Sequence, residues 1–530
     1  MTHAPTRPLE ARLAHNPLLL AILTIAIGGL AGLLFALGAI RLSPMIALAA
    51  IAGVGLVVYL SRNPVMGLYL LALAIPIERF GRITDDTAAF SISITRGLGA
   101  AAAAGMLIHH LIRRKPLLFS RPLALWSLYT LFGLLTLTYS SDFISGVKIA
   151  SGAVGNILFL FVLSNLFLAD SRREMRKRAN TAILLWLVAS MGVAFYSVYD
   201  WHLGSGRTGG IPVGQIDPQA GAQLAQYRWN TVWEDTAEGE ALAGLSLRRS
   251  MGSTSHAAVF GVNLAMTIPF FLYFLFHRNE STWLRAALGA GLLATFYCML
   301  LTNTRSVLLL GAGVMALSAL WGLLPIRGWM LLAGVVMAIV GLLVIPVDVF
   351  NRIFDFQNYT SHKSYAMRIR FDYWHAGLKS ISEHLLGGAG LGNRKVVLEH
   401  LRNPLEGRSS VHNIYIQTMM DTGVFGWMVF ILFLASVQWC AARAAKTLKR
   451  IGAMEEYWMF VAAQILFIGV LVYGLQVDVF YFPLKGWWLI AGLAVATQFA
   501  LMRLLRKSPE HSIALDPDNL HAASQGVSNA

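Results

Sequence analysis

Long apolar runs recur along this chain of 530 residues and restrict its fold more than any other feature. A transmembrane helix needs about 20 apolar residues, because the hydrocarbon core of a bilayer is roughly 30 Å thick. Runs of about this length lie at residues 17–40, 43–60, 64–78, 92–112, 122–139, 147–168, 181–200, 256–276, 284–302, 305–324, 329–347, 412–437, 457–477 and 483–502. Only 13% of the residues are charged, whereas soluble domains carry about 25%. We therefore predict an all-α, polytopic membrane protein with about 14 transmembrane helices.

Basic clusters fix the predicted orientation of these spans. With the N-terminus inside, one frame places nearly every cluster on the inner side: Arg113 to Lys115, Arg172 to Arg178, Arg278 with Arg285, Arg443 to Arg450, and Arg503 to Lys507. Short inner loops are normally rich in Lys and Arg. The net charge of +15 is thus explained by topology, and we expect no nucleic-acid partner. The two cysteines, Cys298 and Cys440, fall outside the predicted outer loops, so no disulfide framework is expected.

The spacing of the runs divides the chain into six parts. We predict N-terminal spans (1–200), a first long outer loop (201–255), spans that include a turn at Arg305 (256–348), a second long outer loop (349–411), C-terminal spans (412–507) and a disordered inner tail (508–530).

The second long outer loop is strongly basic on the side of the membrane where basic residues are normally scarce. It has nine Lys and Arg residues against five acids: Arg352, Lys363, Arg368, Arg370, Lys379, Arg394, Lys395, Arg402 and Arg408, against Asp355, Asp372, Glu383, Glu399 and Glu406. This excess of positive charge indicates an anionic substrate at the outer face.

The middle of this loop, residues 365–386, predicts an amphipathic helix that lies along the membrane surface. Its apolar stripe is Phe371, Trp374, Leu378, Ile381 and Leu385, and its polar face is Arg368, Asp372, His375 and Lys379. Arg370 lies one turn from Trp374, at the edge of the stripe. The glycines that follow the helix allow a tight return of the chain.

Two further positions have side chains suited to chemistry at a membrane surface. Arg305 lies in a short turn between two spans, so it is either an anchor in the headgroups or a group that faces a cavity. His412, followed by Asn413, lies where the second outer loop enters a span. Histidine there is either an ordinary interfacial residue or a base that accepts a proton from a hydroxyl.

Three segments resemble the O-antigen ligase and polymerase superfamily of bacterial envelope proteins. They are LLTNTRSVLLLGAG, which contains Arg305; RIRFDYWHAGLKSISEHLLGGAGLGN, with Arg370, Trp374, Gly388, Gly390 and Gly392; and SSVHNIYIQTMMDTGVFGWMVF, with His412, Asn413, Asp421, Gly423 and Gly426. A weaker fourth similarity surrounds Arg249, Gly252 and Asn263. Thr304 and Asp421 stand where this superfamily more often has Ser and Glu.

The resemblance implies an enzyme of the bacterial inner membrane, with its active site facing the periplasm. Such an enzyme moves a glycan from undecaprenyl diphosphate to an acceptor lipid or glycan, without cofactor or metal. We assign His412, Arg305 and Arg370 as catalytic, with the arginines on the diphosphate and His412 on the acceptor hydroxyl. The predicted substrate-binding residues are Asn413, Trp374, Arg368, Gly388, Gly390, Gly392 and Arg249.

Several alternatives stay open at this level. A ligase that acts on lipid A-core, a polymerase and a protein O-glycosyltransferase all need the same donor site, and a transporter or flippase could bind an anion without chemistry. Charge favours a ligase, because the first long loop balances its arginines with at least as many acids and is a poor second phosphate site. Asp85 and Asp86 could hold a divalent metal but fit solvated loop residues better.

Overall fold

A bundle of long helices makes up the protein in the computed structural model, which describes residues 44–77, 94–203, 250, 252–254, 257–325, 365–393, 411–477 and 484–507. The helices are α3 (Pro44–Arg62), α4 (Pro64–Ala74), α5 (Ile94–Arg113), α6 (Arg121–Thr136), η2 (Leu137–Tyr139), α7 (Phe143–Phe167), α8 (Arg172–His202), α10 (Ala257–Phe276), α11 (Thr282–Leu301), α12 (Arg305–Leu320), α15 (Tyr365–Glu383), α17 (Ile414–Arg450), α18 (Met454–Tyr473) and α19 (Lys485–Lys507). No strand occurs among these residues, so the described part is all-α, as predicted.

Eight of the described helices are long and apolar enough to cross a membrane: α6 with η2, α7, α8, α10, α11, α17, α18 and α19. Shorter apolar helices lie within α3, at α4 and at α12. Twelve of the fourteen predicted runs coincide with a described α-helix, and the runs at 17–40 and 329–347 lie outside the described residues. The structure thus establishes a multi-pass helical protein, while the predicted total of 14 spans stays a prediction.

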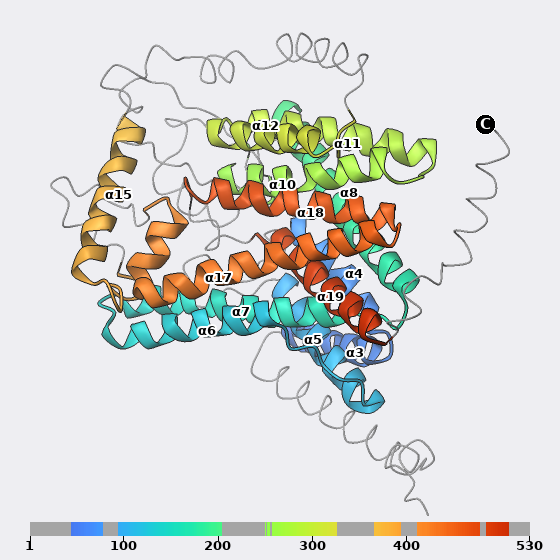
Figure 1. The fold of residues 1–530 in the computed structure, drawn as a ribbon, viewed down its shortest axis with the longest axis horizontal. Coiled ribbons are helices and arrows are strands. Elements are labelled where there is room, and N and C mark those ends of the chain that lie inside the picture. Colours follow the sequence, from blue (N-terminus) through green and yellow to red (C-terminus); the bar gives the residue numbers. More distant parts are fainter. Residues whose placement is uncertain are drawn as a thin grey trace, which may run out of the picture.

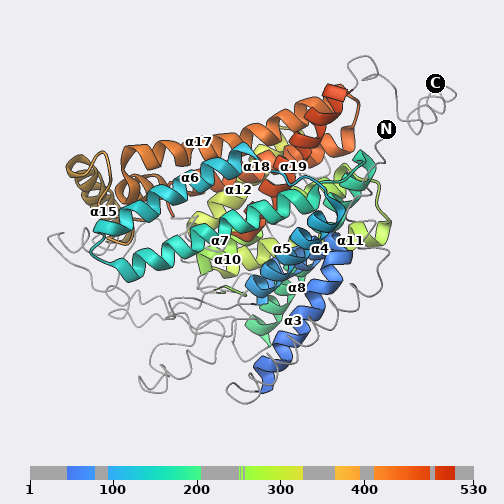
Figure 2. The ribbon, with the colours of Figure 1, turned by 90° about the horizontal axis from the view of Figure 1, so that it is seen from below.

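The centre of the bundle is formed by α10, α18 and α19, most of whose residues are buried. Around them, α17 packs against α6, α18 and α19, and α7 packs against α19 and α6. α15 is set apart, because it crosses one end of the bundle and packs on α17 (Figures 1 and 2).

Two ends of the bundle differ in chemistry. We call one the basic end, where the helices begin or finish with Arg172, Arg176, Arg278, Arg443 and Arg503. The other is the turn end, formed by residues 137–142, 302–304, 387–393 and 411–413. Among the described connections, 137–142 and 302–304 lie at the turn end, whereas 168–171 and 277–281 lie at the basic end, which agrees with the frame predicted from the basic clusters.

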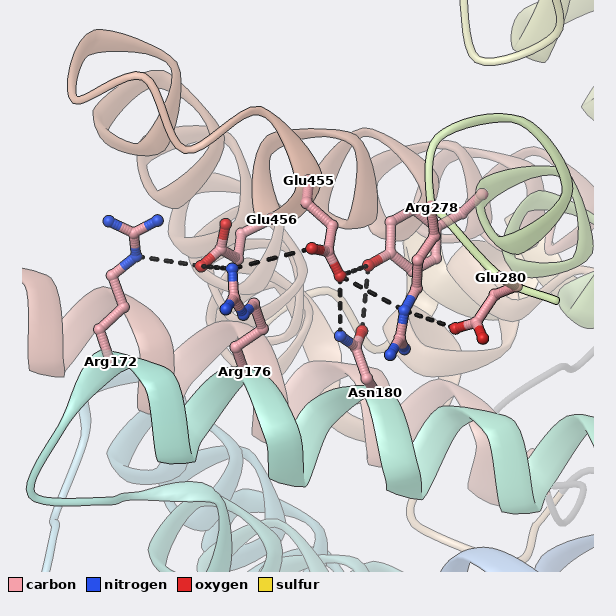
Figure 3. A network of polar contacts seen from close by, with 8 residues as sticks. Arg172, Arg176, Asn180, Arg278, Glu280, Glu455 and Glu456 are labelled. Carbon is pink, nitrogen blue, oxygen red and sulfur yellow. Dashed lines mark hydrogen bonds and ion pairs between the residues drawn. The ribbon is translucent and has the colours of Figure 1, made fainter. Parts of the chain in front are cut away.

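A network of buried and half-buried polar groups joins three helices at the basic end (Figure 3). Arg172 Nε of α8 lies 3.0 Å from Glu456 Oε1 of α18, and Asn180 Nδ2 donates to Glu455 Oε1 at 3.1 Å. Tyr273 of α10 donates to Asn180 Oδ1 at 3.0 Å. Pairing of this kind makes burial of charged groups tolerable, so the network fixes the relative positions of α8, α10 and α18.

α17 has a kink where the segment 387–393 of the turn end packs against it. Gly423 has φ +68°, which interrupts the helix, and the segment after α15 inserts at this point. Ala389 N donates to Met420 O at 2.7 Å, and Val424 N donates to Leu385 O at 2.9 Å. The inserted backbone therefore supplies hydrogen bonds that a straight helix would have made internally, which is the physical cause of the kink.

Candidate active site

The turn before α12 presents Arg305 at the turn end. α11 ends at Leu301, and Arg305 is the first residue of α12. Between them Asn303 has φ +50°, a left-handed conformation that Asn tolerates better than most residues. Ser250 N donates to Leu301 O at 2.8 Å, so the chain before α10 also reaches this turn. Arg305 is partly exposed, as a residue that meets a ligand must be.

His412 and Asn413 form the start of α17. Asn413 is the N-cap, and its Oδ1 accepts from Tyr415 N at 3.0 Å and from Ile416 N at 3.2 Å. Asn and Asp caps satisfy N–H groups that have no partner within the helix. Asn413 is therefore buried and fully engaged in capping, whereas the adjacent His412 is partly exposed. The predicted part of Asn413 in substrate binding stays a prediction.

The end of α18 lies between the Arg305 turn and the His412 segment. Ser306 Oγ, next to Arg305, lies 3.3 Å from Tyr473 Oη. Ile414 N donates to Gly474 O at 2.9 Å, and Tyr415 Oη donates to Leu471 O at 2.7 Å. The last turn of α18 and the residue after it thus contact the first turns of both α12 and α17, so these two N-termini lie on either side of it.

α15 brings the third predicted residue to the same place. Trp374 Nε1 donates to Val411 O at 3.1 Å, which ties α15 to the residue immediately before His412. Gly377 allows a close approach, since a Cβ there would lie 2.8 Å from Ile416 Cγ2. Arg370 is one helical turn before Trp374 and is half-buried. The elements that carry Arg305, Arg370 and His412 therefore converge at the turn end.

Only part of the apolar stripe predicted for α15 is buried in the structure. Ile381 is buried and Trp374 half-buried, while Phe371, Leu378 and Leu385 are exposed. The face that packs on the bundle is instead formed by Tyr373, Gly377, Ser380 and Ile381. The reason is steric, because small side chains let α15 approach α17 closely, and exposed apolar side chains suit a helix that contacts lipid.

The three signature glycines lie against protein backbone. Gly388, Gly390 and Gly392 have φ between +73° and +98°. A Cβ on Gly388 would lie 2.6 Å from Gly423 N, and one on Gly392 would lie 2.5 Å from Gly146 N. Side chains have no room there and strongly disfavour that backbone conformation. These contacts explain the glycines through packing, and their predicted part in substrate binding stays a prediction.

Asn393 completes the docking of this segment onto the turn between α6 and α7. Its Oδ1 accepts from Ser141 N at 2.6 Å and from Asp142 N at 3.1 Å, and Tyr139 Oη donates to Gly387 O at 2.6 Å. The segment 387–393 therefore fastens the end of α15 to both α17 and the α6–α7 turn.

Two predicted substrate-binding residues cannot be placed in the site. Arg249 and the side chain of Arg368 lie outside the described residues, as do Asp85 and Asp86. Within the described ranges, no three His, Cys, Asp or Glu side chains are grouped so that they could hold a metal ion.

Three residues of this region were not among the predicted site residues. Asn303 has a buried amide with no hydrogen-bond partner among the described residues. Gln417 and Asp421 are fully buried in α17, and Gln417 Nε2 donates to Asp421 Oδ1 at 2.9 Å. Polar residues four apart near the end of a predicted span were the signal that could have revealed this pair.

The electrostatics of the turn end favour an anion. A helix N-terminus carries a partial positive charge, and both α12 and α17 begin here without an acidic residue in the first turn. Arg305 and Arg370 add two full charges whose planar N–H groups match phosphate oxygens. The arrangement can bind a phosphate-containing group close to His412.

The fold and this site define a multi-pass membrane protein with a polar, basic centre at one end of its bundle. Residues 290–431 match a family model described as O-antigen ligase, which confirms the predicted resemblance to the O-antigen ligase superfamily. Members of this family are membrane enzymes that transfer glycans. The matched range runs from α11 into α17 and includes Arg305, Arg370 and His412. No curated protein matches the chain.

Proposed function

We propose that this protein is an O-antigen-ligase-type glycosyltransferase. It moves a glycan from undecaprenyl diphosphate to an acceptor such as lipid A-core, on the periplasmic face of the bacterial inner membrane, without a metal or cofactor. The observation that carries the proposal is the convergence of the start of α12, the start of α17 and the middle of α15, within a range that matches the O-antigen ligase family.

Arg305 and Arg370 bind the donor's diphosphate in this proposal. Both are partly exposed and lie on elements that meet at the turn end, where the N-terminus of α12 adds its partial charge. When the bond between C1 of the sugar and the diphosphate oxygen breaks, negative charge grows on that oxygen. Fixed positive groups stabilise this charge more in the transition state than in the ground state, which is the requirement for catalysis.

His412 acts as the general base. The acceptor hydroxyl oxygen forms a new bond to C1 of the sugar, and its proton passes to the imidazole. The diphosphate leaves as an anion and needs no proton, so one base is sufficient. A group with an unperturbed pKa near 6.5 suits this task at neutral pH.

The two ends of the bundle support the proposed side of the membrane. Basic residues at helix ends favour the cytoplasmic side, so a turn end that faces the periplasm is the arrangement we propose. There the exposed Phe371, Leu378 and Leu385 of α15 contact the outer leaflet, where a polyprenyl donor also resides. The donor then reaches Arg370 from within the membrane.

A deletion strain tests the proposed reaction. Loss of a ligase leaves polymerised glycan on undecaprenyl diphosphate and none on the final acceptor, whereas loss of a polymerase leaves single repeats attached to that acceptor. Complementation with His412→Ala is expected to fail even when the variant is present at the same level as the wild-type protein.

Transfer activity in washed membranes is expected to survive EDTA, because arginines carry the charge of the leaving group. In the deletion strain, single repeats attached to the acceptor would mean that the protein is a polymerase and not a ligase.

A further inference from the structure

His412 has a backbone conformation that must be held in place by its neighbours. Its φ is +54°, in the left-handed region that non-glycine residues adopt at a cost of about 1 kcal/mol or more. Such a conformation persists only where the surrounding contacts determine it. The contacts around Val411, the residue before His412, show which side chains hold this conformation.

The backbone groups of Val411 are held from two different helices. Val411 is fully buried. Its N–H donates to Gln417 Oε1 of α17 at 3.4 Å, a long hydrogen bond, and its carbonyl accepts from Trp374 Nε1 of α15 at 3.1 Å. Buried backbone groups without partners are costly, so these two side chains determine where the chain enters His412.

Asp421 fixes the orientation of the Gln417 amide. Gln417 Nε2 donates to Asp421 Oδ1 at 2.9 Å, and both side chains are fully buried. An amide nitrogen only donates hydrogen bonds and Asp421 Oδ1 accepts one here, so the amide nitrogen faces Asp421. The amide oxygen is then left facing Val411 N–H. These hydrogen bonds therefore link Asp421, near the kink of α17, through Gln417 to Val411, which precedes the N-cap of α17.

We propose that Gln417 and Trp374 are positioning residues that act together through Val411 to hold the His412 imidazole at the acceptor hydroxyl. This inference rests on the proposed function, in which His412 is the base. It gives Trp374 a role different from contact with substrate, because its indole N–H is engaged by Val411. Asp421 contributes indirectly by keeping the Gln417 amide in the required orientation.

The experiment compares Gln417→Met with Gln438→Met in purified protein, using lipid-linked glycan and acceptor. Both glutamines lie on α17, but Gln438 is far along the helix from His412, so it is a matched control. Gln417→Met is expected to lower kcat about 10- to 100-fold and to leave the donor KM within about twofold. Gln438→Met is expected to keep both constants, because Gln438 is far along α17 from His412. A loss of packing in α17 alone would not lower kcat while leaving KM unchanged.

Trp374→Phe keeps the ring and removes only the N–H donor, so it tests the second contact even where Gln417→Met folds poorly. It is also expected to lower kcat with little change in KM. Because both side chains act on one residue, Val411, the double variant should lose less than the product of the two single losses. Wild-type kcat in either single variant, or multiplicative losses in the double variant, overturns the proposal.

His412→Ala distinguishes a failure of the positioning proposal from a failure of the proposed function. If it is inactive while Gln417→Met and Trp374→Phe have wild-type kcat, the positioning proposal fails and the proposed function stands. If His412→Ala transfers glycan at the wild-type rate, the assignment of the base itself is wrong.

Discussion

Arg368 and Arg370 are two residues apart on α15, so their positions on the helix differ by roughly 200°. Arg370 shares the side of Trp374, which is bonded to the residue before His412. We predict that Arg370→Ala lowers transfer at least about 100-fold, whereas Arg368→Ala lowers it less than about tenfold. Transfer is measured in membranes with equal amounts of each variant. An equal loss at Arg368 with none at Arg370 would refute the assignment of this face.

At the scale of residues, motif and charge indicated Arg305, Arg370 and His412 as candidates, and the structure brings their elements together. The same reasoning could not find Gln417 as a partner of Val411, because that contact depends on the left-handed turn at His412. It also left Trp374 without a partner, since a hydrogen bond between α15 and α17 follows from packing and not from spacing.

The segment 387–393 acts as an element in its own right, because it fastens α15 to the bundle. Gly392→Ala is predicted to destabilise the protein by more than about 1 kcal/mol. A Cβ there would lie 2.5 Å from Gly146 N and 2.6 Å from Asp142 O, with φ at +95°. Thermal unfolding in detergent should show a lower Tm, together with reduced transfer.

Gly155→Ala is the matched control for this prediction. Gly155 lies within α7, and a Cβ there meets nothing within 4 Å. Because Ala favours a helix by about 1 kcal/mol over Gly, Tm should stay the same or rise. An unchanged Tm in Gly392→Ala would mean that the segment is not tightly docked.

The polar network at the basic end predicts a loss of stability without a loss of chemistry. Glu456→Gln removes the charge that faces Arg172 Nε at 3.0 Å and is expected to cost about 1–2 kcal/mol, allowing for the partial exposure of Arg172. Glu174→Gln is the control, since its pair with Arg178 lies within one helix and is more exposed. Glu456→Gln should lower Tm more than Glu174→Gln, with kcat unchanged in both. A lower kcat at unchanged Tm would contradict a purely structural role.

At the scale of elements, the sequence predicted the existence of α15 and its approximate limits, but not the face it buries. Helical periodicity reports where apolar residues gather, and in a membrane protein they can face lipid as well as protein. Phe371 and Leu378 are exposed for this reason, while Tyr373 and Gly377 form the contact with α17.

The whole molecule has two chemically distinct ends, and their sides of the membrane can be measured. We predict that Ser382→Cys, on an exposed position of α15, reacts with an impermeant thiol reagent once the outer membrane is permeabilised. Thr282→Cys, exposed at the start of α11, should react only after lysis of the inner membrane. Both native cysteines are buried, so background labelling is expected to be low. The reverse pattern would invert the topology.

At this largest scale, apolar length predicted the described helices well, while the number of spans stays a prediction. α4 has 11 residues and is nonetheless apolar and packed against α5 and α8, because a helix surrounded by others need not match the bilayer thickness. The apolar character of α10 and α19 likewise reflects burial within protein as much as contact with lipid. Distinguishing the two requires tertiary contacts.

The proposed transfer of a glycan from a lipid diphosphate can be observed directly with purified components. Purified protein in nanodiscs is given undecaprenyl-diphosphate-linked glycan and lipid A-core, and the products are identified by mass. We predict glycan joined to the acceptor and free undecaprenyl diphosphate in equal amounts with the wild-type protein, and neither product with His412→Ala. Wild-type protein that binds the donor but forms no joined product, whichever acceptor is supplied, would contradict the account.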